Sequence, residues 1–128
     1  MVDSKFAFER LKVWQLSKEY VMTSYDLLKQ FPDYEKFGLC NQIRRAVISI
    51  PSNIAEGSGR LSIKEQLHFI SIAYGSLMEV YCQFSISKDL NYINEDEFTI
   101  IKSQTISISK MLNALRAALE DKLPPHTS

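Results

Sequence analysis

The stretch QIRRAVISIPSNIAEGSGR, residues 42–60, decides the fold. Its apolar residues recur at spacings of four, three and four, at Ile43, Val47, Ile50 and Ile54. This is the period of one face of an α-helix. Gly57 and Gly59 follow, and glycine often ends a helix because it adopts the left-handed cap conformation without strain. The stretch therefore predicts a helix over residues 39–58 with one buried face.

Pro51 lies inside this pattern. A proline within a helix removes one backbone hydrogen bond, and its ring presses on the preceding turn. We therefore expect a kink at Pro51, with the side chains of Ser49, Ser52 and Asn53 close enough to bond the freed carbonyl. Two shorter helices that meet at Pro51 are the alternative.

On the N-terminal side, helical periodicity covers residues 11–30, where the apolar side chains form a wide face. Such a face is typical of a helix that packs against two neighbours. The helix is expected to end at Phe31-Pro32, because the residue before a proline avoids the helical region. Residues 32–38 then form a short connector.

On the C-terminal side, two further helices are expected over residues 62–89 and 95–119. Each follows a capping box, SIKE at 62–65 and NEDE at 94–97, in which a polar side chain and a Glu bond each other's backbone N–H groups. Apolar residues lie nearly all round the helix over 62–89, so this helix is central or covered by a partner chain.

Four helices joined by short connectors predict an all-α fold. Because short connectors make consecutive helices antiparallel neighbours, we expect a single domain over residues 1–128, an antiparallel up-down-up-down four-helix bundle. The tail LPPHTS, residues 123–128, cannot continue a helix and is expected to be frayed. The alternative architecture is a pair of helical hairpins that only a second chain completes.

The formal net charge is zero, from 15 basic and 15 acidic residues. Residues 1–60 hold nine basic and seven acidic residues, and residues 61–128 hold six and eight, so neither half is strongly charged. A protein that grips nucleic acid over its whole surface needs clustered Lys and Arg, so the charge argues against that class. A local basic patch that contacts RNA stays open, and its candidate residues are Arg44, Arg60 and Lys64.

The sequence favours a cytoplasmic protein without membrane partners. Cys40 and Cys82 are the only cysteines and lack CxxC spacing, so both are expected to be reduced thiols. Residues 1–10 contain no apolar run after a basic start, so no signal peptide is expected. No stretch approaches the ~20 apolar residues that a membrane-spanning helix needs.

A polar stripe runs beside the apolar row of the helix over 39–58. Its members are Arg45, Ser49, Asn53 and Glu56, joined by Ser76 and Glu79 of the helix over 62–89, where His68, Ser71 and Gly75 share a face with Glu79. We interpret the stripe as a structural, hydrogen-bonded set that fixes helix register or a subunit contact, because buried charges are usually paired. Arg45 is expected to pair with Glu56 or Glu79. A polar ligand pocket is the alternative.

No metal site or catalytic residue is expected. A di-metal bundle needs Glu-x-x-His on two helices, and Glu65-Gln-Leu-His68 provides one, while His126 falls in the tail. Gly57-Ser58-Gly59-Arg60 lacks the spacing of a phosphate-binding loop and follows no strand. No histidine partner accompanies a Cys or Ser nucleophile. We therefore expect no cofactor and no enzymatic activity.

Several motifs occur together along the chain. They are LKVW at 11–14, Phe31-Pro32, Glu35, Gly38-Leu39, QIRR at 42–45, SIPSNIAEG at 49–57, Arg60, Gly75-Ser76 and Glu79. In this combination the chain resembles, over nearly its whole length, the 23S rRNA-intervening-sequence protein family, also called four-helix-bundle proteins. Cys40 stands where that family often has a capping Thr or Ser, so the start of the helix over 39–58 is expected to be weakened.

The resemblance implies an antiparallel four-helix bundle that assembles as a ring-shaped homopentamer, from bacterial genes often found within intervening sequences of 23S rRNA genes. It carries over no catalytic residue. Similar accessory proteins of diversity-generating retroelements bind nucleic acid through a basic surface, and this neutral chain departs from that pattern.

Two hypotheses of function follow. The first is a non-enzymatic oligomeric scaffold that is RNA-associated. The second is a small enzyme or ligand-binding bundle that uses Arg45, Asn53, Glu56 and Glu79.

Overall fold

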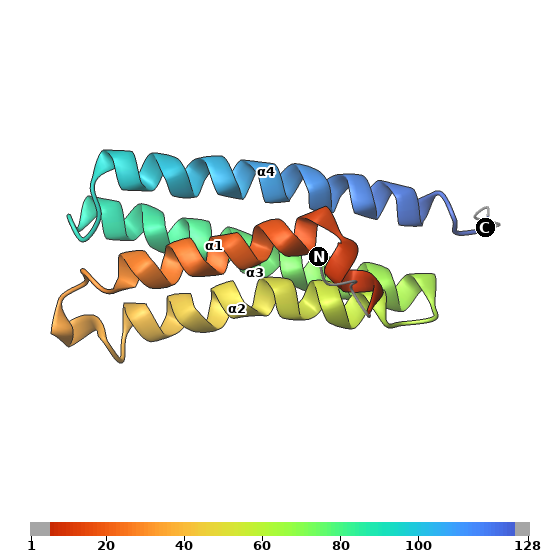
Figure 1. The fold of residues 1–128 in the computed structure, drawn as a ribbon, viewed down its shortest axis with the longest axis horizontal. Coiled ribbons are helices and arrows are strands. Elements are labelled where there is room, and N and C mark those ends of the chain that lie inside the picture. The colour runs from red at the N-terminus through yellow and green to blue at the C-terminus, as the bar shows by residue number, and fades with distance from the viewer. Residues whose placement is uncertain (1–5, 125–128) are drawn as a thin grey trace, which may run out of the picture.

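The computed structural model describes residues 6–124, which form four α-helices and two short 3-10 helices (Figure 1). In chain order these are η1 Ala7–Arg10, α1 Lys12–Leu28, η2 Asp33–Glu35, α2 Leu39–Ser58, α3 Ile63–Asp89 and α4 Glu95–Glu120. The predicted all-α class is confirmed. The first helix ends two residues before the predicted position 30, because the chain tightens into a turn ahead of Pro32.

The four helices lie side by side along the long axis of the molecule, and consecutive helices run in opposite directions (Figure 1). α1 packs against α2 and α4, and α3 packs against the same two helices, so within residues 6–124 no contact crosses the diagonal. This is the up-down-up-down arrangement, and its core is built from one chain without a second copy. The short η1 folds back onto α1 and α2.

All four helices contribute to one apolar core. The predicted row on α2 is buried, with Ile43, Val47 and Ile50 at 0% exposure and Ile54 at 2%. Tyr20 of α1 is also fully buried. Its hydroxyl lies 2.7 Å from the hydroxyl of Thr105 on α4, so the core contains a hydrogen bond between the first and last helices.

The helix starts follow the capping signals only in part. At α4 both bonds of the box form, because Glu97 N–H donates to Asn94 and Asn94 N–H donates to Glu97. At α3 the Ser62 hydroxyl accepts from Glu65 N–H, at 3.3 Å, without the return bond. Cys40 does not act at the start of α2. It is buried in the core, and the Glu35 carboxylate accepts from Leu39 N–H instead.

α2 runs without a break through Pro51, so the alternative of two helices that meet there is wrong. The role predicted for the glycines is also wrong in part. Gly57 lies inside α2 and is buried, and the helix ends at Gly59 with φ −87°, which is not the left-handed conformation. The N–H of Gly59 instead bonds the carbonyls of Glu56 and Gly57, which tightens the last turn.

Two predictions concern residues at the chain ends. The frayed tail predicted for 123–128 falls mostly on residues 125–128, which lie outside the described residues together with His126. Residues 1–5, half of the stretch in which no signal peptide is expected, also lie outside the described residues. Within residues 6–124, no helix has the length and apolar character needed to cross a bilayer.

Candidate functional site

The polar stripe lies where α2 and α3 pack, and its hydroxyls link the two helices. The Ser76 hydroxyl of α3 donates to the Ser49 hydroxyl of α2 at 2.8 Å. The Asn53 amide donates to both the carbonyl and the hydroxyl of Ser49, each at 2.8 Å. Ser49, Asn53 and Ser76 thus form a small hydrogen-bonded set beside Pro51.

The predicted ion pairs of Arg45 are absent from the described residues. Glu56 pairs with Arg60, four residues later and just past the end of α2, at 2.8 Å. Glu79 accepts a hydrogen bond from Gln83, at 3.2 Å. Arg45 is exposed and has no hydrogen-bond or ion-pair partner within residues 6–124. Glu56 pairs with Arg60 because Arg60 follows it by four residues, whereas Arg45 lies about three helical turns before it on α2.

Gln42 and Gln83 belong to this region and were missed by the sequence analysis. Gln83 is buried on α3, and its amide nitrogen donates to Gln42 of α2, at 3.1 Å, as well as to Glu79. The signal was present: Gln83 lies one turn after Glu79 and falls in the row of α3 that also contains the buried Val80 and Phe84. The bond between the two glutamines gives α2 and α3 a second polar link.

A hollow of about 450 Å³ opens on this face. It is lined by Gln42, Arg45, Ala46, Ser49, Ser76 and Glu79. The hollow presents a guanidinium without an ion pair, a carboxylate, an amide and two hydroxyls, which suits small polar ligands or a polar protein surface. Asn53 and Glu56 do not line it. His68 and Ser71 are exposed and also lie outside it, so no histidine meets a nucleophile there.

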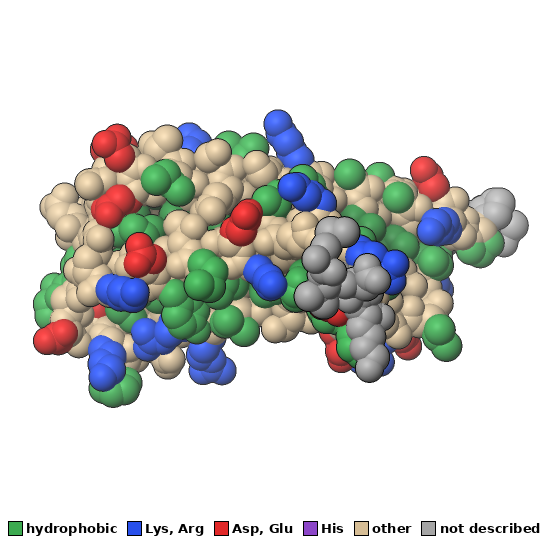
Figure 2. Space-filling view, in the orientation of Figure 1, with side chains coloured by type: hydrophobic (Ala, Val, Ile, Leu, Met, Phe, Trp, Pro, Cys, Tyr) green, Lys and Arg blue, Asp and Glu red, His purple; other side chains and the backbone are tan. Residues whose placement is uncertain are grey.

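A second and larger hollow, which we call the α1–α2 groove, lies between those two helices. It measures about 590 Å³ and is lined by Phe8, Trp14, Lys18, Val21, Met22, Ile48, Pro51, Ser52 and Ala55. Met22 is 71% exposed and Ile48 42% exposed. Figure 2 shows hydrophobic side chains gathered over α1 and α2. Lys18 is the single charged residue of the lining, and its Nζ sits 4.4 Å from the Trp14 ring centroid.

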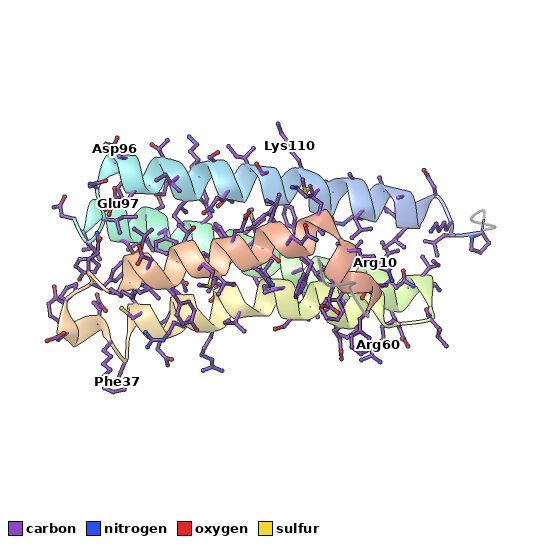
Figure 3. All side chains as sticks on the ribbon, viewed as in Figure 1. Arg10, Phe37, Arg60, Asp96, Glu97 and Lys110 are labelled. Atoms are coloured by element: carbon purple, nitrogen blue, oxygen red, sulfur yellow. The ribbon has the colours of Figure 1, made fainter. Side chains whose placement is uncertain are left out.

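The three candidate RNA contacts do not form one patch. Arg44 stands near the start of α2 and Arg60 just after its end, sixteen residues later, which is about 24 Å along a helix. Arg60 is occupied by Glu56 and by the Phe69 ring, whose centroid lies 4.9 Å from its Cζ. Lys64 is exposed at that same end. Of the three candidates, only Arg44 therefore lies near the start of α2. Figure 3 shows Phe37 at that end of the bundle and Arg60 toward the other end.

The end of the bundle that holds Arg44 carries exposed aromatic rings. Phe37 is 85% exposed and Tyr34 is 77% exposed, both in the connector between α1 and α2. The Arg44 guanidinium donates to the Lys36 carbonyl at 3.0 Å, which holds it beside this connector. Residue spacing alone did not distinguish these rings from core aromatics, because a short connector has no helical period.

The sulfur and carboxylate groups add no reactive centre in the part of the chain that the structure describes. Within residues 6–124, no three His, Cys, Asp or Glu side chains gather where they could share a metal ion. Both cysteines are free thiols. Cys82 is exposed, whereas Cys40 is buried, and burial raises the pKa of the Cys40 thiol and keeps it protonated.

Comparisons with known proteins agree with this architecture. A structure similar in fold is the crystal structure of a protein of unknown function from the S23 ribosomal protein family of Bacteroides thetaiotaomicron, with a TM-score of 0.75 and 24% identity. The match covers 81% of this chain and 97% of that chain. No curated protein matches. The family model of the 23S rRNA-intervening sequence protein matches residues 9–114, most of the chain. The chain therefore belongs to the 23S rRNA-intervening sequence protein family.

Proposed function

We propose that this chain is a non-enzymatic scaffold that assembles with copies of itself in the bacterial cytoplasm. The observation that supports this most is the α1–α2 groove, which leaves Met22 and Ile48 exposed at its edge. Large apolar surfaces that are continuous and exposed are typical of protein interfaces. The ring of five subunits is taken from the family resemblance.

The other two helices carry exposed apolar side chains that are candidates for the contact with this groove. Exposed aliphatic side chains on α3 and α4 include Ile72, Met78, Ile86, Ile100 and Ile106. A contact between two different surfaces of the same chain is heterologous, and repeated contacts of this kind form a ring when the rotation between copies closes and a filament when it does not. The groove of one copy against the α3–α4 surface of the next is therefore the assembly that we propose.

Light scattering on the purified chain at micromolar concentration tests the assembly. We expect a mass of several subunits. Met22→Asp and Ile48→Asp each place a charge in the groove and are expected to shift the mass toward the monomer, while the fully exposed Leu61→Asp serves as a control. A wild-type monomer would reject the scaffold proposal.

We also propose that the scaffold associates with RNA. This RNA-associated part of the proposal rests on the cationic groups beside the connector, Lys36 and Arg44. Neither makes an ion pair within residues 6–124, so both are available to phosphates. Binding is expected to weaken as salt rises, because phosphate contacts release counterions. Arg44→Glu is expected to weaken RNA binding more than Arg60→Glu, since Glu56 already neutralises Arg60.

A ligand-binding role for the hollow between α2 and α3 is the second candidate, and the free guanidinium of Arg45 favours it. The same hollow offers Glu79, so a small zwitterion would find both charges matched. Thermal-shift measurements with amino acids test this role. Stabilisation of the wild type that Arg45→Ala abolishes would support it, and no shift at millimolar concentration would count against it.

A further inference from the structure

We propose that the connector between α1 and α2 is a stacking platform for a single-stranded stretch of nucleic acid, with Tyr34 and Phe37 as the rings on which bases stack. This inference rests on the RNA-associated part of the proposed function, and it names the form of nucleic acid and the residues that bind it.

The exposure of the two rings is the first observation. Phe37 is 85% exposed and Tyr34 is 77% exposed, whereas Phe31, at the start of the same connector, is 7% exposed. Figure 3 shows Phe37 pointing away from the bundle. Leaving two aromatic rings in water forgoes the stability that their burial provides, and it keeps most of each ring accessible to a ligand.

The second observation is that Tyr34 is held in place. The Tyr34 and Tyr92 hydroxyls lie 3.2 Å apart, and Tyr34 is the donor because the single proton of Tyr92 goes to the Glu35 carboxylate. The two rings meet edge to face with centroids 6.4 Å apart. Tyr92 in turn packs on Phe31 and lies 2.8 Å from a carboxylate oxygen of Glu35. A ring that is already ordered loses little entropy when a base stacks on it.

The third observation is the charge beside the rings. The Lys36 Nζ lies 5.6 Å from the Phe37 ring centroid, and Arg44 donates to the Lys36 carbonyl. Figure 2 shows Lys and Arg side chains gathered near the start of α2. Glu35 is engaged by Tyr92 and by Leu39 N–H, so it is turned to the protein. Asp33 is the exposed acid of the connector, and the phosphates are therefore expected to follow Lys36 and Arg44.

These features together indicate single strands. Bases within a duplex stack on each other and hide their faces, whereas bases of a single strand stack on aromatic side chains while cations follow the backbone. Stacking tolerates any sequence, because every base has a flat face. A neutral protein with one small cationic and aromatic end suits a short strand better than a long duplex.

Fluorescence anisotropy with a labelled 12-nucleotide oligo(U) RNA, at low salt, tests the platform on the full chain. A DNA strand and a 12-base-pair RNA duplex are measured beside it. We expect the single strands to bind more tightly than the duplex. Phe37→Ala and Tyr34→Ala are each expected to weaken single-strand binding about 5- to 150-fold, the range for the loss of one stacked base.

Three variants serve as controls. Leu61→Ala removes an apolar side chain that is 100% exposed at the other end of α2, and it should not change binding. Phe37→Trp and Tyr34→Phe keep a ring and should keep binding within a few fold. Because all three positions are on the surface, circular dichroism and light scattering are expected to match the wild type.

The outcomes distinguish failure of the stacking platform from failure of RNA binding as a whole. If Arg44→Glu weakens binding but Phe37→Ala and Tyr34→Ala do not, RNA binds without the platform, and this inference is overturned while the proposed function stands. If no oligonucleotide binds at low salt, this inference and the RNA-associated part of the proposed function both fail, while the self-assembling scaffold is tested separately by light scattering. If the chain binds anionic phosphatidylserine vesicles but no oligonucleotide, the rings and cations serve a membrane surface, and the inference is again overturned.

Discussion

The Ser76 hydroxyl donates to the Ser49 hydroxyl across the packed faces of α2 and α3, at 2.8 Å. Ser49 also accepts from the Asn53 amide, so the α2 hydroxyl receives two donors. The polar stripe therefore contributes to the packing of α2 on α3 at this point, and it does so through hydroxyls and an amide rather than through the charges that flank them.

Ser76→Ala is expected to lower the free energy of unfolding by about 0.5–1.5 kcal/mol, the usual net contribution of one hydrogen bond. The loss stays modest because Ser49 keeps the Asn53 donor. Chemical denaturation measures it. Ser71→Ala, on the exposed side of the same helix, should change stability by less than about 0.5 kcal/mol. Equal effects of the two variants would show that the bond contributes nothing.

Much of α2 was predictable because its buried row repeats with the helical period. Ile43, Val47 and Ile50 are fully buried, and their helical spacing predicts this burial whichever helix packs over them. The partner of a charged side chain has no such period. For Glu56 the spacing along the chain already favours Arg60 over Arg45, whereas whether Arg45 meets Glu79 depends on rotamers and on how α3 packs on α2. Neither expected Arg45 pair forms within residues 6–124.

The α1–α2 groove could not be predicted from the sequence pattern either. The periodicity of residues 11–30 predicts a wide apolar face, and packing against two neighbouring helices was enough to explain that width. The face is only partly covered, and Met22 stays 71% exposed. How far two helices close over each other depends on the side chains of both, such as Pro51 and Ala55 opposite Trp14 and Val21.

Arg45→Ala is expected to leave the melting temperature of the dissociated chain nearly unchanged, because the guanidinium makes no bond within residues 6–124. Glu79→Ala should cost up to about 1 kcal/mol, because Gln83 loses one of its two acceptors. Light scattering measures the mass of both variants, and a lower mass would show that the hollow between α2 and α3 faces a neighbouring subunit. If Glu79→Ala changes neither melting temperature nor assembly, the structural interpretation of the stripe is wrong.

The two thiols are expected to react very differently with iodoacetamide at pH 8. Cys82 is exposed and should be alkylated within minutes. Cys40 is buried, and burial raises the pKa of its thiol, so little thiolate exists and the reagent does not reach it. Mass spectrometry of peptides counts the modified sites, and denaturant should expose Cys40. Rapid alkylation of Cys40 in buffer would mean that α2 opens at its start.

Tyr20→Phe is expected to lower the free energy of unfolding by about 1 kcal/mol at pH 7. Thr105 has one hydroxyl proton and donates it to the Ile101 carbonyl at 2.7 Å, so Tyr20 must be the donor in its bond with Thr105. Thermal or chemical denaturation measures the loss. If the variant matches the wild type, the buried hydroxyl is not net stabilising.

The burial of Tyr20 also predicts that the free energy of unfolding falls at alkaline pH. Burial raises the pKa of Tyr20 above its usual value, so the folded chain keeps the proton longer than the unfolded chain. The resulting stability is complete below about pH 10, where unfolded tyrosine titrates, and it falls as pH rises further. The advantage of the wild type over Tyr20→Phe should therefore shrink between pH 9 and pH 11, and an unchanged difference would contradict the burial argument.

Gly57 and Gly75 are expected to respond to alanine with opposite signs. A Cβ at Gly57 would lie 2.9 Å from the Phe69 Cβ, where α3 approaches α2, so Gly57→Ala should destabilise by about 1–3 kcal/mol. A Cβ at Gly75 meets nothing within 4 Å, and Gly75→Ala should stabilise by about 0.5–1 kcal/mol because alanine favours helix. Urea denaturation of the two variants compares them directly. A neutral Gly57→Ala would mean that α2 and α3 separate at this point without cost, and the close approach would then not explain why a glycine stands inside α2.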